Sequence, residues 1–212
     1  MSPRPKLDHL RKPQIVSAAA EVMYERGLFD TRIGDIAERA GTSAPTILYY
    51  FDSKDRLLEE AVAFADAEFY SRLSEGQARI ESPAERLVHL IEETSLGPGG
   101  LNDYTLWMEI WVRARRDAKV RHSYFGLDRR QRRLIAEIVI AGQEAGEFIA
   151  DVDPDDFALM LSGMLDGLGV QVTLGQPDVS PERLVDCCLR LASRELGYPF
   201  TRRPEAEQEA TA

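Results

Sequence analysis

The amino-acid sequence predicts an all-α protein of about nine helices. Helix starts recur as a capping side chain followed by a proline and an acidic residue, for example at residues 82–85 (SPAE) and 180–182 (SPE). Glycine-containing breaks such as residues 97–100 and 175–177 separate apolar periodic segments, and strand-like alternation is nearly absent. The predicted helices span residues 10–27, 32–40, 44–50, 53–77, 83–96, 102–117, 119–145, 154–175 and 181–196.

Size and composition predict one small and one medium-sized domain without a membrane partner. The chain has 212 residues, of which 44% are hydrophobic, and this is ample for a buried core. No apolar run approaches the ~20 residues that cross a bilayer, and residues 1–14 lack the apolar segment of a secretory signal. We therefore expect a cytoplasmic protein. Cys187 and Cys188 are expected to be core thiols, because adjacent cysteines in a reducing compartment rarely form a disulfide.

Residues 31–57 are typical of two short helices joined by a tight turn. The apolar residues of 33–40 have helical spacing, and Gly41 can adopt the left-handed conformation that ends a helix. The second helix is too short to be a core element, yet it is rich in hydrogen-bonding side chains. Such a helix suits the DNA major groove, where small polar groups reach base edges and hydroxyls reach phosphates. An ordinary helical hairpin would explain the glycine but not Tyr49 and Tyr50 beside Lys54.

The same segment resembles the DNA-binding region of the TetR family of transcriptional regulators. The matching features are Thr31, the IAxxAG pattern of residues 36–41, the aromatic residues 49–51 and the SKDRL motif of residues 53–57. The resemblance implies a three-helix helix-turn-helix domain over residues 1–54, in a repressor that binds double-stranded operator DNA. Leu48 stands where the family most regularly has a tyrosine, so the phosphate contact expected there must come from Tyr49 or be absent.

The candidate DNA contacts follow from these residue types. Ser43 and Thr46 are predicted to face base edges, whereas Thr31, Tyr49 and Lys54 are predicted to face phosphates, together with Tyr50. The complete predicted DNA-binding set is Thr31, Arg32, Thr42, Ser43, Ala44, Pro45, Thr46, Tyr49, Tyr50 and Lys54.

The net charge of −10 argues against DNA binding, because DNA-binding domains are usually basic. The charge is unevenly distributed, however. Residues 1–60 hold nine basic and ten acidic side chains, whereas residues 61–212 hold 17 and 26. The N-terminal segment up to the first turn of the first helix is basic, with Arg4, Lys6, Arg11 and Lys12 against Asp8 alone. A solvated tail and an arm that contacts phosphates or the minor groove are equal alternatives for it.

The second domain, predicted over residues 55–199, contains two segments that could form a ligand site. Tyr104, Trp107, Met108 and Trp111 share one helical face, although such a stripe alone more often indicates a core. Asp166 is the single acid of the apolar, glycine-containing segment 161–170, which is predicted to be helical. Desolvating a carboxylate costs several kcal/mol, so this acid requires a partner. Either an arginine of the chain or a cationic ligand could provide the positive charge.

Both segments are similar to motifs in the choline-responsive subset of the family. The W-x-x-F-W motif is matched by residues 107–111 and the I-D-G-L motif by residues 165–168. The resemblance implies a small-molecule effector, and aromatic rings with a counter-charge favour an organic amine. A lipophilic or unknown effector is the alternative. Gly169 stands where that subset has a tryptophan, so choline itself is not implied.

A homodimer is predicted through the last two long helices. Gly163 and Gly167 would allow close backbone approach, and Leu184, Cys188 and Leu191 lie on an apolar face that a monomer would leave partly wet. Such a dimer requires an inverted-repeat operator. The alternative is that these residues only complete the chain's own core.

The sequence does not indicate an enzyme, a cofactor or a metal site. His9, His89 and His122 are scattered without metal-ligand spacing, and no nucleophile or phosphate-loop motif occurs. The alternative to a regulator is a protein that uses its acidic helical domain to bind another protein. Residues 200–212 have no apolar face and are predicted to form a disordered tail.

Overall fold

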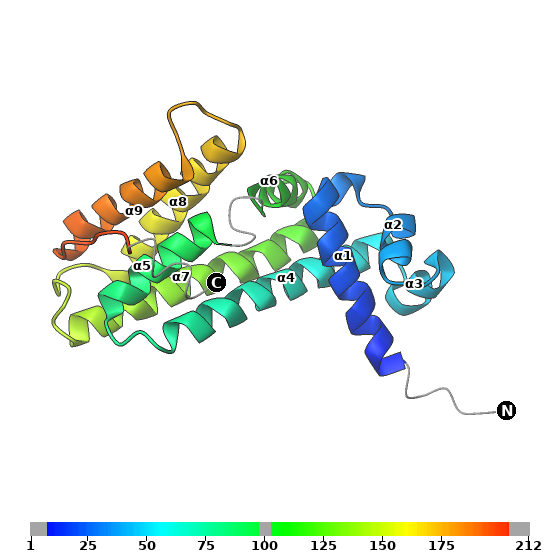
Figure 1. Cartoon of the computed structure of the whole chain (residues 1–212), viewed down its shortest axis with the longest axis horizontal. Helices are drawn as coiled ribbons and strands as arrows, with labels where there is room; N and C mark the ends of the chain where they lie inside the picture. The colour runs from blue at the N-terminus through cyan, green and yellow to red at the C-terminus, as the bar shows by residue number, and fades with distance from the viewer. Residues whose placement is uncertain (1–7, 98–102, 204–212) are drawn as a thin grey trace.

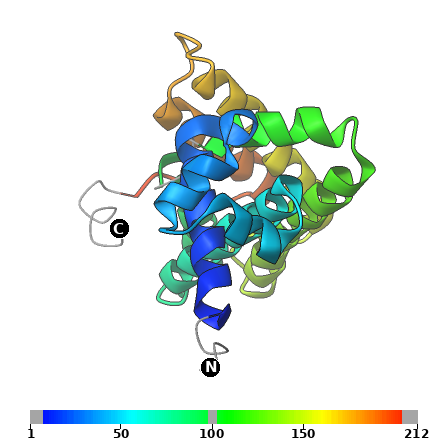
Figure 2. The ribbon, with the colours of Figure 1, turned by 90° about the vertical axis from the view of Figure 1, so that its right-hand side faces the viewer.

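The computed structural model describes residues 8–97 and 103–203, which form nine helices and no strands. The all-α prediction is therefore confirmed. In chain order the helices are α1 (Asp8–Asp30), α2 (Ile33–Arg39), α3 (Ala44–Phe51), α4 (Lys54–Gln77), α5 (Pro83–Leu96), α6 (Asp103–Ala114), α7 (Ala118–Glu144), α8 (Pro154–Thr173) and α9 (Pro181–Leu196). Helices α1–α3 form one end of the molecule, and α4 leads from them into the larger domain (Figure 1). Viewed from that end, α1–α3 lie in front of the larger domain (Figure 2).

Side-chain caps start most helices where the sequence indicates them. Ser43, Ser53, Ser82 and Ser180 each accept a hydrogen bond from the backbone N–H three residues later. The largest boundary differences are in α1 and α6. Helix α1 continues to Asp30 past a non-helical residue, Gly27, whose φ is 80°, and α6 ends at Ala114 instead of residue 117.

Two clusters of buried side chains organise the described chain. The N-terminal cluster joins α1–α3 to the first turns of α4 through Leu57 and Leu58, and it also includes Leu106 and Ile110 of α6. The second cluster joins α5, α7, α8 and α9 to the far end of α4. The domain boundary predicted after residue 54 thus falls in the first turn of α4, and part of α4 packs with the N-terminal domain.

The sequence predicts a disordered tail from residue 200, but residues 200–203 belong to the packed domain. Phe200 is 8% exposed, and its ring lies 5.7 Å from that of Phe148 and 4.8 Å from that of Tyr198. Arg203 forms an ion pair with the buried carboxylate of Glu92. The packed domain therefore extends through Arg203, because Phe200 provides an apolar anchor that the polar composition of the tail conceals. The remaining predicted tail, residues 204–212, lies outside the described residues.

Neither a membrane-spanning helix nor a metal site is present among the described residues. No helix there is long and apolar enough to cross a bilayer, and no group of His, Cys and acidic side chains is arranged to hold a metal ion. His89 is 1% exposed, and burial lowers its pKa to about 4. This histidine is therefore neutral at pH 7.

Two glycines of α7 provide a matched test of the packing in the second cluster. A Cβ atom at Gly142 would lie 2.1 Å from the Phe148 ring, whereas one at Gly126 would meet nothing within 4 Å. We expect Gly142→Ala to lower the free energy of unfolding by ~1–3 kcal/mol, because the buried ring has no space to move. Gly126→Ala should raise it by ~0.5–1 kcal/mol, because alanine favours the helix. Urea unfolding measures both, and similar effects would contradict this packing.

Candidate functional site

Helices α2 and α3 form the helix-turn-helix unit at the end of the molecule. Ile36 and Ala37 of α2 and Ile47 and Phe51 of α3 are buried in the N-terminal cluster. Gly41, between the two helices, has a φ of 59°, in the left-handed region that glycine favours. The opposite face of α3 is open to solvent. Its most exposed large side chain is Tyr49, which is 79% exposed.

The two predicted base-reading side chains contact each other at the start of α3. The hydroxyls of Ser43 and Thr46 are 2.8 Å apart, and the backbone N–H of Thr46 donates to the Ser43 hydroxyl at 3.3 Å. Ser43 and Pro45 are exposed, whereas Thr42, Ala44 and Thr46 are half-buried. Ser43 therefore caps the helix, and a base edge would have to compete with or share this internal contact.

The predicted phosphate contact of the Thr31 side chain is corrected by the structure. Thr31 is fully buried, and its hydroxyl donates to the backbone carbonyl of Gly27 at 2.6 Å. The hydroxyl closes the bend after α1 and is not available to a phosphate. The neighbouring side chain of Arg32 is exposed. Lys54 begins α4 and is half-buried, while the Tyr50 ring lies edge-on to Tyr49 at 5.3 Å.

Of the seven lysines and arginines among the described residues up to 60, four form ion pairs within the protein. Arg39 contacts Glu21 and Glu25 at 3.0 and 2.7 Å, and Arg26 contacts Asp35 at 3.1 Å. Lys12 and Arg56 both pair with Glu60, at 2.9 and 3.2 Å. Among residues 8–60 as described, the cations without a carboxylate partner are Arg11, Arg32 and Lys54. Arg4 and Lys6 of the basic segment lie outside the described residues.

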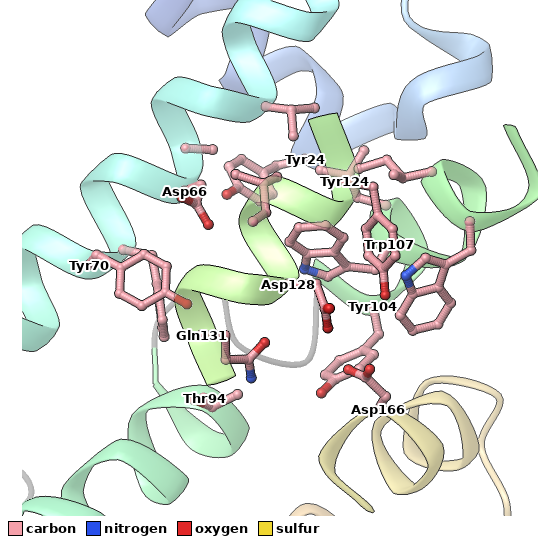
Figure 3. Close-up of a pocket in the computed structure, with 17 residues that line it drawn as sticks. Tyr24, Asp66, Tyr70, Thr94, Tyr104, Trp107, Tyr124, Asp128, Gln131 and Asp166 are labelled. Atoms are coloured by element: carbon pink, nitrogen blue, oxygen red, sulfur yellow. The ribbon is translucent and has the colours of Figure 1, made fainter. Parts of the chain in front are cut away.

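A cavity of about 100 Å³, here called the effector cavity, lies inside the larger domain against α1, α4, α5, α6, α7 and α8 (Figure 3). Four of the five predicted ligand residues line it: Tyr104, Trp107, Trp111 and Asp166. Met108 does not. Met108 directly follows Trp107, so its side chain points in a direction rotated by ~100° around the helix axis. It is half-buried outside the cavity. The role of the four lining residues in binding stays a prediction.

The cavity also contains residues that the sequence analysis missed. Two further acids, Asp66 of α4 and Asp128 of α7, face it, and α1, α4 and α7 add aromatic side chains (Figure 3). These additional aromatic residues are Tyr24, Phe69, Tyr70 and Tyr124. The Tyr124 ring lies edge-on to Trp107 and Trp111, with centroids 6.2 and 6.4 Å away. Because α4 and α7 are long helices rich in charges, no local motif distinguishes their cavity-facing residues.

The three cavity carboxylates differ in their partners. Asp66 pairs with Arg130 at 3.0 Å, and Asp128 pairs with Arg132 at 2.5 Å. Asp166 forms no ion pair or hydrogen bond with any residue in the described part of the chain. Burial and, secondarily, the nearby charge of Asp128 raise the pKa of Asp166 to about 6. At pH 7 the cavity thus presents one unneutralised negative charge among aromatic rings.

Gly169 is tightly packed against the cavity wall. A Cβ atom there would lie 2.3 Å from Cζ of Tyr104, so the Tyr104 ring fills the space that a side chain at position 169 would need. One aromatic wall therefore comes from α6 instead of α8. The shape of the cavity differs accordingly from one with a tryptophan at position 169.

The predicted dimer residues fall into two groups. Leu184 and Cys188 are fully buried against the chain's own α5 and α8, so they are not the wet apolar face that the sequence analysis expected. Leu191 is half-buried. Gly163 and Gly167 lie on the exposed side of α8, and a Cβ atom at either position would meet nothing within 4 Å.

Two polar contacts connect α6 to the N-terminal domain. The backbone N–H of Leu28 donates to the Glu109 carboxylate, and Arg113 pairs with Asp55 at 2.8 Å. Glu109 lies between Trp107 and Trp111 in sequence, on a different face of the helix. A displacement of α6 by a bound ligand would therefore reach both α1 and the start of α4.

Comparison with known proteins assigns both parts of the chain to described families. Residues 15–61 match the model of bacterial regulatory proteins of the tetR family, and residues 83–197 match the C-terminal domain of BetI-type transcriptional repressors. The regulator BetI of Vibrio campbellii is 26% identical over 188 residues, which cover 85% of this chain and 89% of that protein. The regulator PksA of Bacillus subtilis is 26% identical over 182 residues, covering 84% and 87%.

A similar solved structure comes from Saccharomonospora viridis. It shows a transcriptional regulator in complex with choline, with 29% identity and a TM-score of 0.79. The match covers 89% of this chain and 98% of that one.

Asp166 is expected to destabilise the native protein at neutral pH. Its pKa is raised to about 6 from an ordinary value of 3.8, so the folded state binds a proton more tightly than the unfolded state. The cost therefore grows as the pH rises from about 4 to 6 and is fully present above that window. We expect Asp166→Asn to raise the free energy of unfolding by ~1–2 kcal/mol at pH 7, allowing for partial solvent screening, and to have little effect near pH 4.

Chemical denaturation at the two pH values measures this difference. Asp178→Asn, which removes an exposed acid from the turn after α8, serves as the control. A gain from Asp166→Asn that is the same at both pH values would contradict the raised pKa.

Proposed function

The chain belongs to the TetR family of bacterial regulatory proteins and has a BetI-type C-terminal domain, and from this premise we infer that it is a dimeric repressor released from its operator by an organic cation. Proteins of this family are ligand-responsive DNA-binding regulators and not enzymes. The observation that carries the cation proposal is the unpaired carboxylate of Asp166 in an aromatic cavity.

The charge balance of the effector cavity favours a ligand with one positive charge. Arg130 and Arg132 compensate Asp66 and Asp128, so one negative charge, on Asp166, is left for the ligand. Trp107, Trp111 and Tyr124 add aromatic rings, whose faces attract cations and whose apolar surface excludes water. The choline bound by the Saccharomonospora viridis relative is such a cation. Because Tyr104 occupies the space beside Gly169, this chain need not prefer choline itself.

On the DNA side, α3 is the proposed reading helix. Its exposed face presents Tyr49 and Pro45, with Ser43 and Thr46 near the N-terminus, which is the end that points into the major groove in helix-turn-helix proteins. Arg32 at the start of α2 and Lys54 at the start of α4 have no internal ion-pair partners and are the proposed phosphate contacts. Tyr49 supplies a further hydroxyl at the position closest to the missing family tyrosine.

The proposed dimer interface is the exposed side of α8 together with α9. Gly163 and Gly167 form an open strip there, beside Leu159 and Met160, which are 55% and 43% exposed. Half-buried Leu191 lies on α9. Exposed apolar side chains beside glycines suit close packing of helices from a second copy. Two copies would place their reading helices one DNA turn apart, ~34–36 Å, on an inverted repeat.

Release from DNA is proposed to proceed through α6 and α4. A cation drawn between Trp107, Trp111 and Asp166 acts on α6, and α6 contacts the N-terminal domain through Glu109 and Arg113. Helix α4 runs from Lys54 at the DNA side to the cavity wall at Asp66. The effector shifts the equilibrium only by binding the released conformation more tightly than the DNA-bound one.

The proposed phosphate contact of Lys54 can be tested by substitution. Lys54→Ala should weaken binding to all DNA sequences by a similar factor and reduce the slope of log affinity against log salt by about 1, because one phosphate contact is lost. Thr46→Ala should instead reduce the preference for the operator over other sequences. Arg79→Ala, which removes an exposed cation just beyond α4, controls for net charge. Fluorescence anisotropy with an operator selected from random duplexes measures these effects, and an unchanged salt slope for Lys54→Ala would contradict the assignment.

The second prediction tests the cation site and thereby the proposed function. In calorimetry with choline and tetramethylammonium, Asp166→Asn should weaken binding at least ~30-fold, because losing one partner of a buried charge pair costs ~2–5 kcal/mol. Trp111→Ala should weaken it ~2–30-fold through lost cation–π attraction. Operator binding without effector should not change, and Asp178→Asn should match the parent protein. A neutral effector bound equally well by Asp166→Asn would show that Asp166 is a structural acid.

The proposed homodimer can be tested at Gly167. Gly167→Glu should convert the dimer to a monomer, because it places two like charges and two side chains where helices of the two copies meet. Gly126→Glu introduces the same side chain at an open position of α7 and should leave the dimer intact. Sedimentation at micromolar concentration distinguishes the outcomes. A parent protein that sediments as a monomer with and without DNA would contradict the dimer.

A further inference from the structure

A second cavity, here called the junction cavity, adjoins the effector cavity. It has a volume of about 240 Å³ and lies among α1, α4, α6 and α7, where the two domains meet. Four side chains line both cavities: Val62, Ile110, Tyr124 and Leu127. The two spaces are therefore separated only by a partition one side chain thick. Three of its members, Val62, Tyr124 and Leu127, are half-buried.

The two cavities differ in chemistry. The effector cavity contains three carboxylates and most of the aromatic rings, whereas apolar side chains dominate the junction cavity. The apolar lining consists of Leu28, Leu58, Val62, Ala63, Ile110, Val120 and Leu127. Three charged side chains also line it: Asp55 and Arg113, which pair at 2.8 Å, and half-buried Glu59. Ala63 and Ser123 are exposed and mark its opening to solvent. The junction cavity thus suits hydrocarbon, and the effector cavity suits a cationic head.

The volumes of the two cavities also favour a ligand that occupies both. Ligand sites are usually ~300–1,000 Å³, so the effector cavity, at about 100 Å³, is small for a complete ligand. The two cavities together reach the lower end of that range. A ligand longer than a compact head group can extend past Ile110 and Tyr124, which line both cavities, into the junction cavity.

We propose that the effector is an elongated amphiphile with a cationic head at Asp166 and an unbranched apolar tail in the junction cavity. The inference rests on the proposed cation site and adds the tail. The tail ends beside Leu28 of α1 and the ion pair between Asp55 and Arg113. Filling the junction cavity therefore acts directly on the contact between the two domains, and a longer tail releases DNA more effectively than a compact cation at equal occupancy.

The test is calorimetry of the full-length protein with n-alkyltrimethylammonium ions from methyl to octyl, below their micelle-forming concentrations. Affinity should rise about fourfold for each methylene that enters the junction cavity, because burying a methylene is worth ~0.8 kcal/mol. The rise should stop when the cavity is full. Release of operator DNA, followed by anisotropy at saturating ligand, should increase along the same series.

Two variants narrow the junction cavity without touching the head site. Ala63→Leu and Ser123→Leu change exposed lining residues, and each should remove at least tenfold of the gain from the octyl tail while leaving tetramethylammonium affinity unchanged. Ala67→Leu, one turn further along α4, is exposed and lines neither cavity. It should bind the whole series as the parent protein does.

The outcomes separate the tail from the cation site. Equal affinity along the series, or tail-dependent affinity that neither variant lowers, overturns the tail while the cation proposal stands. Tighter binding of a bis-quaternary ion than of the octyl monocation also overturns it, because half-buried Glu59 of the junction cavity would then hold a second charge. If no member of the series binds, the cation proposal itself fails.

Discussion

Helix α6 packs on both halves of the molecule, and the arrangement of the candidate site depends on this double contact. Leu106 and Ile110 are buried with α1 and α4 in the N-terminal cluster, and they line the effector cavity together with Tyr104 and Trp107. A helix with 3.6 residues per turn places such residues on adjacent faces. A small rotation or shift of α6 therefore changes the cavity wall and the domain junction together.

The Glu109 carboxylate explains the backbone at the end of α1. It accepts the N–H of Leu28, and Gly27 beside it has a φ of 80°, with a hypothetical Cβ atom only 2.9 Å from a Glu109 oxygen. Only glycine fits both the conformation and the space. This contact fixes the bend that brings α1 against α6. The orientation of α1–α3 and the position of α6 in the cavity wall therefore depend on the same hydrogen bond.

Asp166 shows how function and stability oppose each other in this domain. A half-buried carboxylate without a cation lowers native stability, and a neutral side chain would remove that cost. Asp66 and Asp128 pair with arginines instead, although burial still raises the pKa of Asp66 above its ordinary value. In the proposed function, the effector cation is the missing partner of Asp166. The ion pair then contributes to effector affinity the free energy that the unpaired carboxylate costs the ligand-free protein. The acidic net charge is compatible with DNA binding because Arg11, Arg32 and Lys54 of the described N-terminal region have no carboxylate partner.

The sequence alone determined the helical class, most helix boundaries and the helix-turn-helix unit, because caps, glycines and apolar periodicity act over a few residues. It also predicted four residues that line the effector cavity: Trp107, Trp111 and Asp166 stand in local motifs, and Tyr104 lies one helical turn before Trp107. Tertiary structure decided everything that depends on distant partners. Thr31 is buried by the bend after α1, and Leu184 and Cys188 are covered by α5 and α8 of the same chain. Asp66, Asp128 and Tyr124 join the cavity only because α4 and α7 cross beside α6. The spacing of apolar residues along one helix predicts which face is apolar, but only tertiary packing determines which other element covers that face.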